Sequence, residues 1–532
     1  MPQMNEFMAS LYWPYVVAGG VILVSTVAFY RLFFHPLAKF PGPKLAAVTR
    51  SFEAYYDVVC NGQYTFKIAE MHKKYGTFWR PLPSFPWTSS NYLIGPIVRI
   101  SPYELHISDP DFYEKIYSRE GEWDKYAWAY DAFGAPLSTI CAIGHNIHKH
   151  RRAAVNPFFS KANVAAKSDI ILRLVEKLCS RIDEFADESN MAKLSLSAAI
   201  SALTRDVATE FILGKKYNNL ELQDFNQSLA VIFQNSGSLW RTTKHLRWYG
   251  PLMKSIPMWL VERTADNGVK NFFNFLKDMV GNCSTIHSAL ANGKRDPDAP
   301  RTIVHQIFDS DLPEEEKRFE RIFDEVGTIT GAAFETTAHS IRLTLYHIYS
   351  DPEVLRRLRA ELASTRQGER ESKLVLSSLE QLPYLTAVLL EGLRLGPATA
   401  TRANRVASNR ELFFRGRRIP AGTPVGMTTY MMHRDPDIYP DPEQFQPQRW
   451  LDLQERRRLE KFYAPFSKGP RNCLGMYLAW AELYMTIAAV VERFDLVFDN
   501  SALGDLTCTS DQFIIGTSGR NGLPVTVRRV KD

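Results

Sequence analysis

The residues best suited to chemistry in this sequence lie between Phe466 and Gly475, in the segment Phe-Ser-Lys-Gly-Pro-Arg-Asn-Cys-Leu-Gly. A single cysteine is usually a small buried hydrophobic residue. Here glycines flank Cys473, an arginine stands two positions before it, and a helix-like run follows from Leu474 to Phe494. This order predicts a tight loop at a helix N-terminus, where the helix dipole stabilises a thiolate. The segment therefore predicts a cysteine at a position where the helix dipole favours negative charge.

The same segment resembles the haem-ligating loop of the cytochrome P450 superfamily. The resemblance implies that Cys473 is the thiolate ligand of the iron of haem b, where it donates electron density and favours cleavage of the O–O bond. Gly469 and Gly475 let the main chain approach the sulfur and the porphyrin closely. Arg471 is expected to bind a haem propionate, and Phe466 to pack beneath the porphyrin on the sulfur side.

A second candidate segment, Gly-Ala-Ala-Phe-Glu-Thr-Thr, lies within a long helix predicted from Phe323 to Tyr346. Small residues and threonines can simply mark close helix packing. The resemblance implies instead that Ala332 and Ala333 leave room for O₂ beside the haem. It also implies that the hydroxyl of Thr336 opens the helix and hydrogen-bonds the bound dioxygen, while Glu335 links that hydroxyl to bulk water for proton delivery.

A further motif resembles a family segment that holds the cysteine loop in place. Glu391 and Arg394 share one face of a helix that begins near Pro383, and taken alone they indicate a solvated helix surface. The resemblance implies that they bind Arg449 and thereby fix the cysteine loop, a structural role.

Besides Arg471, three residues are expected to contact the haem propionates. His148 and Arg152 stand four apart and face the same side of a predicted helix, which could also be an ordinary basic surface. The resemblance assigns both to the propionates and adds Arg405, from a strand predicted over Arg402 to Arg405.

Three regions are expected to shape a substrate pocket. Trp123 to Cys141 and Ile232 to Val261 are rich in aromatic and apolar residues, and Asp511 to Gly516 could form a third wall. An apolar pocket with few polar groups suits a lipophilic small molecule. The same apolar residues could instead dip into a lipid bilayer.

The N-terminal region predicts a membrane anchor. No charged residue lies between Glu6 and Arg31, and Tyr12, Trp13 and Tyr30 suit the membrane interfaces. A cleaved signal peptide is the alternative, but the positive charge follows the apolar span, at Arg31 and Lys39, instead of preceding it. This order predicts a single-pass anchor in the endoplasmic reticulum membrane with the bulk of the chain in the cytosol. We expect a lumenal N-terminus over residues 1–10, the anchor over 11–30, a proline-rich hinge over 31–45 and a haem domain over 46–532.

The net charge and the cysteine spacing limit the classes of partner and the cellular compartment that we expect for this protein. The formal net charge of +6 is modest and does not indicate nucleic-acid binding. The six cysteines show no paired spacing, which favours a reducing compartment.

No second block follows Cys473 to carry flavin and nicotinamide, so NADPH electrons must come from a separate protein. The resemblance implies NADPH–cytochrome P450 reductase, with cytochrome b5 as a second candidate. A basic run before the cysteine loop, Arg456 to Arg458 with Lys461 and Lys468, could guide such a partner.

Residues 77–95 are not expected from the resemblance. They separate Lys74-Tyr75-Gly76 from a run that begins at Pro96, and these two halves look like one continuous family segment. A surface insertion and a retained intron both explain them.

Together the motifs predict a mainly α (α+β) cytochrome P450 fold with small β-sheets behind one transmembrane helix. Resemblance to trichodiene-oxygenase-like fungal enzymes implies a monooxygenase that hydroxylates or epoxidises a terpenoid or similar secondary metabolite. The alternatives are an O₂-independent haem-thiolate isomerase or dehydratase, and a membrane haem protein made non-catalytic by residues 77–95.

Overall fold

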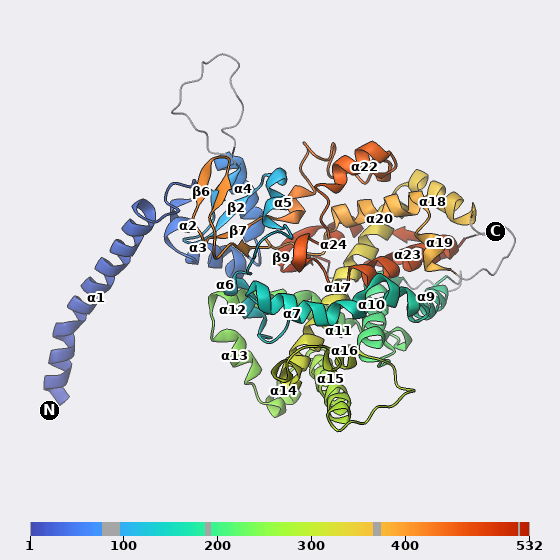
Figure 1. Cartoon of the computed structure of the whole chain (residues 1–532), viewed down its shortest axis with the longest axis horizontal. Helices are drawn as coiled ribbons and strands as arrows, with labels where there is room; N and C mark the ends of the chain where they lie inside the picture. Colours follow the sequence, from blue (N-terminus) through green and yellow to red (C-terminus); the bar gives the residue numbers. More distant parts are fainter. Residues whose placement is uncertain (1, 77–95, 187–192, 365–373, 520–521, 531–532) are drawn as a thin grey trace, which may run out of the picture. The chain divides into compact units, whose positions relative to one another are not determined.

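The computed structural model describes residues 2–76, 96–186, 193–364, 374–519 and 522–530 (Figure 1). The predicted 77–95 insertion lies outside these residues. The chain divides into two compact units, one made of residues 1–116, 122–124 and 403–427 and the other of residues 117–121, 125–402 and 428–532. The predicted mainly helical fold with small sheets and an N-terminal apolar helix is confirmed. The single haem domain over 46–532 stays a prediction beside this division.

The first unit begins with α1 (Pro2–Phe33), an unbroken helix. Its apolar stretch from Tyr15 to Phe33 is long enough to cross a membrane, and its side chains are mostly exposed. The apolar stretch therefore begins and ends a few residues later than the predicted 11–30 span, and α1 runs into the predicted hinge. After it, Gly42 lies so close to Arg99 that a Cβ would overlap the carbonyl oxygen of Arg99.

A small sheet forms the middle of this first unit, with the strand order β1-β2-β7-β4. Strands β2 and β7 are parallel, and the other two pairings are antiparallel. A separate hairpin pairs β5 with β6. Besides α1, the elements of this unit include α2 (Lys44–Val48), α3 (Ser51–Ala54), α4 (Tyr64–Gly76), β1 (Ile97–Arg99), β2 (Leu105–Ile107), α5 (Tyr113–Ile116), β4 (Arg405–Val406), β5 (Leu412–Phe414), β6 (Arg417–Ile419) and β7 (Pro424–Gly426).

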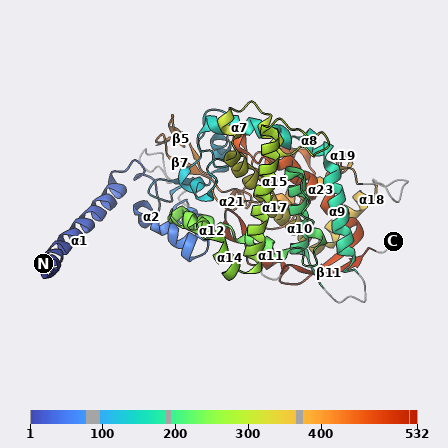
Figure 2. The ribbon, with the colours of Figure 1, turned by 90° about the horizontal axis from the view of Figure 1, so that it is seen from below.

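The second unit is built around α17 (Phe319–Ser350), which packs against helices from distant parts of the sequence (Figure 2). Its neighbours include α10, α11, α15, α20 and α23. The main helices of this unit are α7 (His145–Val155), α9 (Ser168–Asp183), α10 (Leu196–Leu213), α11 (Gln227–Asn235), α12 (Gly237–His245), α13 (Tyr249–Lys254), α14 (Met258–Thr264), α15 (Asn267–Ala291), α18 (Pro352–Ser364), α20 (Pro383–Leu395), α22 (Leu453–Glu460) and α23 (Met476–Arg493).

The helices that position the candidate site are set by local sequence signals. Helix α20 begins at Pro383, a position where a missing N–H costs no hydrogen bond. Gly392 on α20 faces α17 so closely that a Cβ would overlap the hydroxyl of Thr344. Helix α10 ends where Gly214 adopts the left-handed conformation, with φ of 65°. The predicted helices over Phe323–Tyr346 and Leu474–Phe494 are thus found as α17 and α23, with ends shifted by a few residues.

Two small sheets complete the second unit. Strand β11 (Pro524–Arg529) lies between β3 (Leu194–Ser195) and β8 (Phe494–Phe498), antiparallel to both. Strands β9 (Cys508–Gln512) and β10 (Ile514–Thr517) form a hairpin. The residue that joins them, Phe513, has φ of 72°, a conformation that is rare for a bulky side chain. The predicted third pocket wall is therefore the strained tip of a hairpin.

Candidate functional site

Cys473 lies in the short loop between a 3-10 turn (Gly469–Arg471) and the first residue of α23. Its backbone N–H donates to the carbonyl oxygen of Phe466 at 2.8 Å, which closes the loop. Burial raises the pKa of the thiol, while a hydrogen bond from the Gly475 N–H and the charge of Arg152 act in the opposite direction. Cys473 is nevertheless the one exposed cysteine of the six, all of which lie in described ranges. Cys473 is thus accessible to a ligand, although the surrounding protein desolvates its thiol.

Gly469 is required by the shape of this loop. Its φ is 74°, and a Cβ would overlap the backbone carbonyl of Tyr117. A side chain at this position would therefore be strained and would also collide with the chain. Gly475 differs, because a Cβ there would meet no atom within 4 Å. The space beside Gly475 is therefore open.

Arg152 and Arg471 fasten the cysteine loop to α7 and to the residues before it. The Arg152 guanidinium donates from Nη1 to the Asn472 carbonyl oxygen at 2.9 Å and from Nη2 to the Cys473 carbonyl oxygen at 3.3 Å. Arg471 donates to the carbonyl oxygens of Ala142 and Ile143 at 2.6 and 2.7 Å. The predicted propionate contacts of Arg152 and Arg471 stay predictions, because both side chains here hold backbone carbonyls. His148 lies buried on the same helix as Arg152.

The middle of α17 has an open face. Ala332 is exposed and Gly331, Ala333 and Thr336 are half-buried, whereas Phe334 and Glu335 beside them are buried. A Cβ on Gly331 would meet no atom within 4 Å. The Thr336 hydroxyl donates to the Ala332 carbonyl oxygen at 2.8 Å.

The predicted opening of the helix at Thr336 stays a prediction. Helix α17 is continuous from Phe319 to Ser350. A threonine hydroxyl can share the carbonyl of residue i−4 with the backbone N–H, so the extra bond leaves the helix intact.

Glu335 is buried in this structure, and its predicted link to bulk water stays a prediction. Its side chain is buried, and its Oε2 accepts from Nε2 of Gln234 at 2.9 Å and from Nη2 of Arg342 at 3.2 Å. Arg342 in turn donates to the hydroxyl of Ser201 at 2.9 Å. The carboxylate is therefore turned toward α10 and α11. Its second oxygen, Oε1, has no partner among the described residues.

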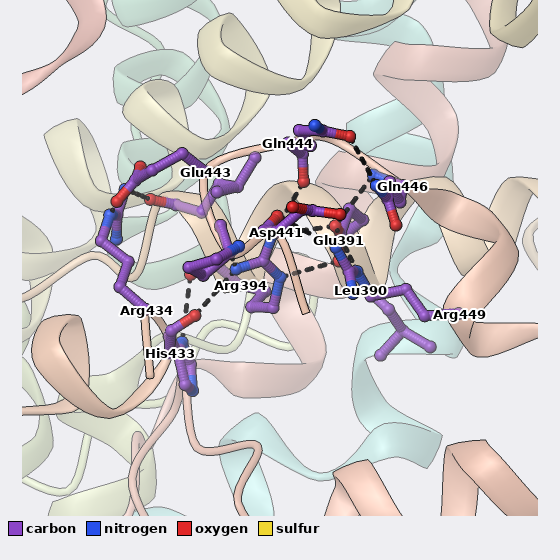
Figure 3. Close-up of polar contacts among 12 residues, drawn as sticks. Leu390, Glu391, Arg394, His433, Arg434, Asp441, Glu443, Gln444, Gln446 and Arg449 are labelled. Atoms are coloured by element: carbon purple, nitrogen blue, oxygen red, sulfur yellow. Dashed lines mark hydrogen bonds and ion pairs between the residues drawn. The ribbon is translucent and has the colours of Figure 1, made fainter. Parts of the chain in front are cut away.

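Glu391, Arg394 and Arg449 meet as the resemblance implied (Figure 3). Both residues of the α20 pair are fully buried. Arg394 donates from Nε to Oε2 of Glu391 and from Nη2 to Oε1, both at 2.9 Å, and Arg449 donates from Nε to Oε1 at 3.1 Å. Two partners were not predicted: Trp450 donates from Nε1 to Oε2 at 2.8 Å, and the Gln446 N–H donates to Oε1 at 2.9 Å. One carboxylate thus accepts five hydrogen bonds.

Arg394 also organises the chain that leads to this cluster (Figure 3). Its Nη1 donates to the carbonyl oxygens of His433 and Pro442 at 2.8 and 2.7 Å, and its Nη2 donates to that of Gln444 at 3.0 Å. A single guanidinium therefore holds three points of one irregular segment. These contacts could not be predicted from residue types, because every residue has the same backbone carbonyl.

The three predicted pocket regions come together in one aromatic cluster. The ring of Phe513 lies 4.7 Å from that of Phe133 and 5.4 Å from that of Trp240, both edge to face. Tyr130 stacks on Phe133 at 5.8 Å. Trp240 donates from Nε1 to the Ala129 carbonyl oxygen at 2.9 Å. The cluster, Tyr130, Phe133, Trp240 and Phe513, is an apolar wall built by α6 (Ala127–Tyr130) and its following turn, α12 and the β9–β10 hairpin.

Arg405 and the basic run before the cysteine loop make contacts that were not predicted from the sequence. Arg405 belongs to strand β4 of the first unit, where its Nη1 donates to the Asn404 carbonyl oxygen at 3.0 Å; its haem contact stays a prediction. The basic run is partly neutralised, because Arg456 pairs with Glu460 at 2.8 Å and Arg458 with Glu455 at 2.6 Å. The i+3 and i+4 spacing of these acids in the sequence could have shown this.

Comparisons with known proteins agree with this arrangement. The family described as cytochrome P450 matches residues 63–519. The chain therefore belongs to the cytochrome P450 family and is a cytochrome P450 monooxygenase of the haem-thiolate type.

Similar proteins come from fungi. The chain is 38% identical to cytochrome P450 monooxygenase MO6277 of Ascocoryne sarcoides, over 90% of this chain and 91% of that one. It is 33% identical to cytochrome P450 monooxygenase TRI4 of Fusarium sporotrichioides, over 93% and 92% of the two chains. A crystal structure of a cytochrome P450 (CYP102L1) matches with a TM-score of 0.64 and 18% identity, over 82% of this chain and 92% of that one. This last likeness concerns the fold.

The residues present fit the haem that the family implies. Cys473 is accessible to a ligand, and the Gly475 N–H stabilises its thiolate form. The open face of α17 at Gly331 and Ala332 leaves space without side chains. A thiolate next to arginine side chains suits an iron porphyrin, whose metal takes the sulfur and whose carboxylates take cations.

Proposed function

We propose that this cytochrome P450 inserts one oxygen atom of O₂ into a C–H bond or an alkene of a lipophilic secondary metabolite, and that this metabolite is a terpenoid. The observation that carries the reaction type is the Cys473 loop at the start of α23. Haem bound there supplies activation of O₂ through its thiolate ligand. The substrate class is supported by relatives named TRI4 and conidiogenone synthase; another relative is named a tryptophan 6-hydroxylase, so the ring chemistry of relatives varies.

We assign the handling of protons to two neighbouring residues of α17. Thr336 holds its hydroxyl proton toward the Ala332 carbonyl, on the open face of the helix. A rotation of its side chain would release this proton toward a ligand beside Ala332 and Ala333. Glu335 is fixed through Oε2 by Gln234 and Arg342, which leaves Oε1 to take up and pass on a proton. Thr336 would deliver the proton, and Glu335 would replace it with a proton taken from water once its side chain has left Gln234 and Arg342.

We propose that the aromatic cluster forms the wall against which the substrate packs. Trp240 is buried, and its polar N–H is already bonded to Ala129. The cluster thus presents carbon surfaces of aromatic rings, which favour an apolar ligand. Arg241 donates to the Asp511 carbonyl oxygen at 2.7 Å, which fixes α12 to the hairpin. The wall is consequently stiff enough to orient a rigid polycyclic substrate.

We propose that α1 anchors the protein in the endoplasmic reticulum membrane, with residues 1–10 in the lumen and the catalytic part in the cytosol. The apolar stretch from Tyr15 to Phe33 and the positive charge of Arg31 support this orientation. In the second unit, exposed apolar side chains gather on α13, α14 and the residues before them, with Trp248 60% and Trp259 64% exposed. Such side chains suit the lipid interface, so a substrate dissolved in lipid could enter from the bilayer.

We propose that the electrons come from NADPH through NADPH–cytochrome P450 reductase, with cytochrome b5 as an additional donor. The basic run before the cysteine loop supports an acidic partner only in part, because Glu455 and Glu460 neutralise two of its arginines. Arg457 is exposed and remains a candidate contact. His148, Arg152, Arg405 and Arg471 are proposed to bind the haem propionates after exchanging their present partners.

The experiment that tests the reaction type is a carbon-monoxide difference spectrum of reduced membranes that contain the protein, with Cys473→Ser beside it. We expect a strongly red-shifted Soret band that the variant lacks. NADPH consumption with added reductase and a sesquiterpene then tests turnover. Product formation from a peroxide without NADPH would instead support an isomerase or dehydratase. Absence of the band despite protein in the membrane would refute the haem-thiolate assignment for this chain.

A further inference from the structure

A buried histidine links the Glu391 cluster to the segment that leads into the cysteine loop. His433 is fully buried, and both nitrogens of its ring are engaged. Nδ1 lies 3.1 Å from the carbonyl oxygen of Arg394, and Nε2 lies 3.0 Å from the backbone nitrogen of Ala464. The carbonyl oxygen of His433 accepts in turn from Nη1 of Arg394 (Figure 3). The residue therefore bonds α20 twice and the chain before Cys473 once.

These partners define the protonation state of the ring. A carbonyl oxygen can only accept, so Nδ1 must carry a hydrogen and donate to Arg394. A backbone N–H can only donate, so Nε2 must be bare and accept from Ala464. An added proton on Nε2 would set two donors against each other. Burial together with the charges of Arg394, Arg434 and Lys468 keeps the pKa of His433 low, at about 3, so the bridge persists at physiological pH.

Aromatic packing fixes the plane of the ring. His433 stacks on Tyr463 with the ring centroids 5.6 Å apart and the planes at 9°. Tyr439 meets its edge at 6.2 Å and 75°. The ring has therefore little freedom to turn, and the position of Nε2 determines where the Ala464 N–H can lie.

Ala464 starts the turn that carries Phe466 to the cysteine. Its carbonyl oxygen accepts from the Ser467 N–H at 3.0 Å, and the Phe466 carbonyl oxygen accepts from the Cys473 N–H at 2.8 Å. We propose that His433 is a positioning residue of the haem-thiolate site, which transmits the fixed position of Arg394 through Ala464 to the loop of Cys473. This inference rests on the proposed function, since it concerns the placement of the haem ligand.

Two substitutions separate the two bonds of the ring. In His433→Gln the amide oxygen can reach the place of Nε2 and accept from Ala464, whereas in His433→Asn the shorter amide can replace the Nδ1 donor but leaves the Ala464 N–H unpaired. His433→Phe keeps the stack on Tyr463 and loses both bonds. His347→Phe is the matched control, because His347 also stacks on an aromatic ring, Phe445, at 4.7 Å and 4°, but does not bond the Ala464 segment.

The readout is the ligation state of the haem in the full-length protein, with the unfolding midpoint measured in parallel. In the carbon-monoxide spectrum of the reduced protein, thiolate-ligated haem gives the red-shifted Soret band, and haem that has lost its thiolate gives a band at shorter wavelength. We expect His433→Asn and His433→Phe to raise the ratio of the second band to the first by about tenfold, the effect of one lost hydrogen bond. His433→Gln and the His347→Phe control should stay near the natural ratio.

Several outcomes would overturn the proposal. One is a folded, haem-loaded His433→Asn protein whose ratio of the two Soret bands equals that of the unsubstituted protein. Another is an equal loss of the red-shifted band in His433→Gln and His433→Asn that is explained by their lower unfolding midpoints alone. If His433→Phe fails to fold, the comparison of Gln with Asn at matched haem content decides. A natural protein without any red-shifted band would refute the proposed function itself, so the two failures are distinguishable.

Discussion

The substitution Glu391→Gln is expected to destabilise the second unit strongly, although it changes one oxygen atom to nitrogen. The Glu391 carboxylate accepts five hydrogen bonds, two at Oε2 and three at Oε1. An amide has a single acceptor oxygen, and its nitrogen would face donors. The less costly orientation puts the nitrogen in place of Oε2, where Arg394 Nε and Trp450 Nε1 lose their acceptor.

The magnitude follows from these two lost bonds. A hydrogen bond to a charged group contributes about 1.5–3 kcal/mol, so the loss is about 3–6 kcal/mol. This agrees with the roughly 3–5 kcal/mol for leaving one charge of a buried pair without its partner, which applies because Arg394 and Glu391 are both fully buried. A loss of this size raises the unfolded fraction by about 10²- to 10⁴-fold.

Pulse proteolysis of the solubilised full-length protein over a urea series measures the change, because it does not require reversible heating. Glu353→Gln is the matched control. Glu353 pairs with Arg356 at 2.7 Å with the same i,i+3 spacing, but both side chains are more than half exposed, so its midpoint should not move. A Glu391→Gln midpoint equal to that of the control would refute the role assigned to the buried carboxylate.

Three further predictions concern the site. Thr336→Ala should lower coupling, the amount of product formed per NADPH consumed, by at least about tenfold while the release of peroxide rises. Thr336→Ser, which keeps the hydroxyl, should retain coupling. Unchanged coupling in Thr336→Ala would contradict the proton role assigned to Thr336. Gly237→Ala would place a Cβ against the backbone of Gln512 and push α12 off the hairpin, which should raise KM about tenfold. The control Gly281→Ala, whose Cβ meets nothing within 4 Å, should leave KM unchanged. Equal KM values for the two variants would contradict the role of the α12–hairpin contact. Burial lowers the pKa of His339 to about 3. Below pH 6.5 this side chain is therefore protonated in the unfolded chain but not in the folded chain. Stability should therefore fall by about 1.4 kcal/mol per pH unit as pH drops from 6.5 toward 5; His339→Gln, measured by urea unfolding, should lack this share of the slope, and identical slopes would contradict it.

The parts of the site that short motifs encode could be predicted from the sequence. Cys473 and its glycines form one continuous segment, and Glu391 and Arg394 share a helix face by spacing alone. Trp450 directly follows the predicted partner Arg449 in the sequence, yet its bond to Glu391 could not be foreseen. The reach of an indole N–H depends on how a 3-10 turn, Pro447–Trp450, packs against α20.

The parts that depend on contacts between distant residues could not be read in this way. Glu335 was expected to link to bulk water, and its inward bonds to Gln234 and Arg342 were not predicted. Arg342 stands seven residues after Glu335 and so shares its helix face, a signal that was present in the sequence. Nothing comparable marks Phe513, because no local pattern predicts a positive φ for a bulky residue.

The five bonds of Glu391 also set an order of events during synthesis. Arg449 and Trp450 lie 58 and 59 residues further along the chain, so at about 5–20 residues per second the carboxylate waits about 3–12 s for them on the ribosome. During this interval the Glu391 carboxylate on α20 still needs water as a hydrogen-bond donor, so the helix cannot complete its packing. A chain that stops before Arg449 would keep this carboxylate without the Arg449 and Trp450 donors, so its core around α20 would stay incomplete.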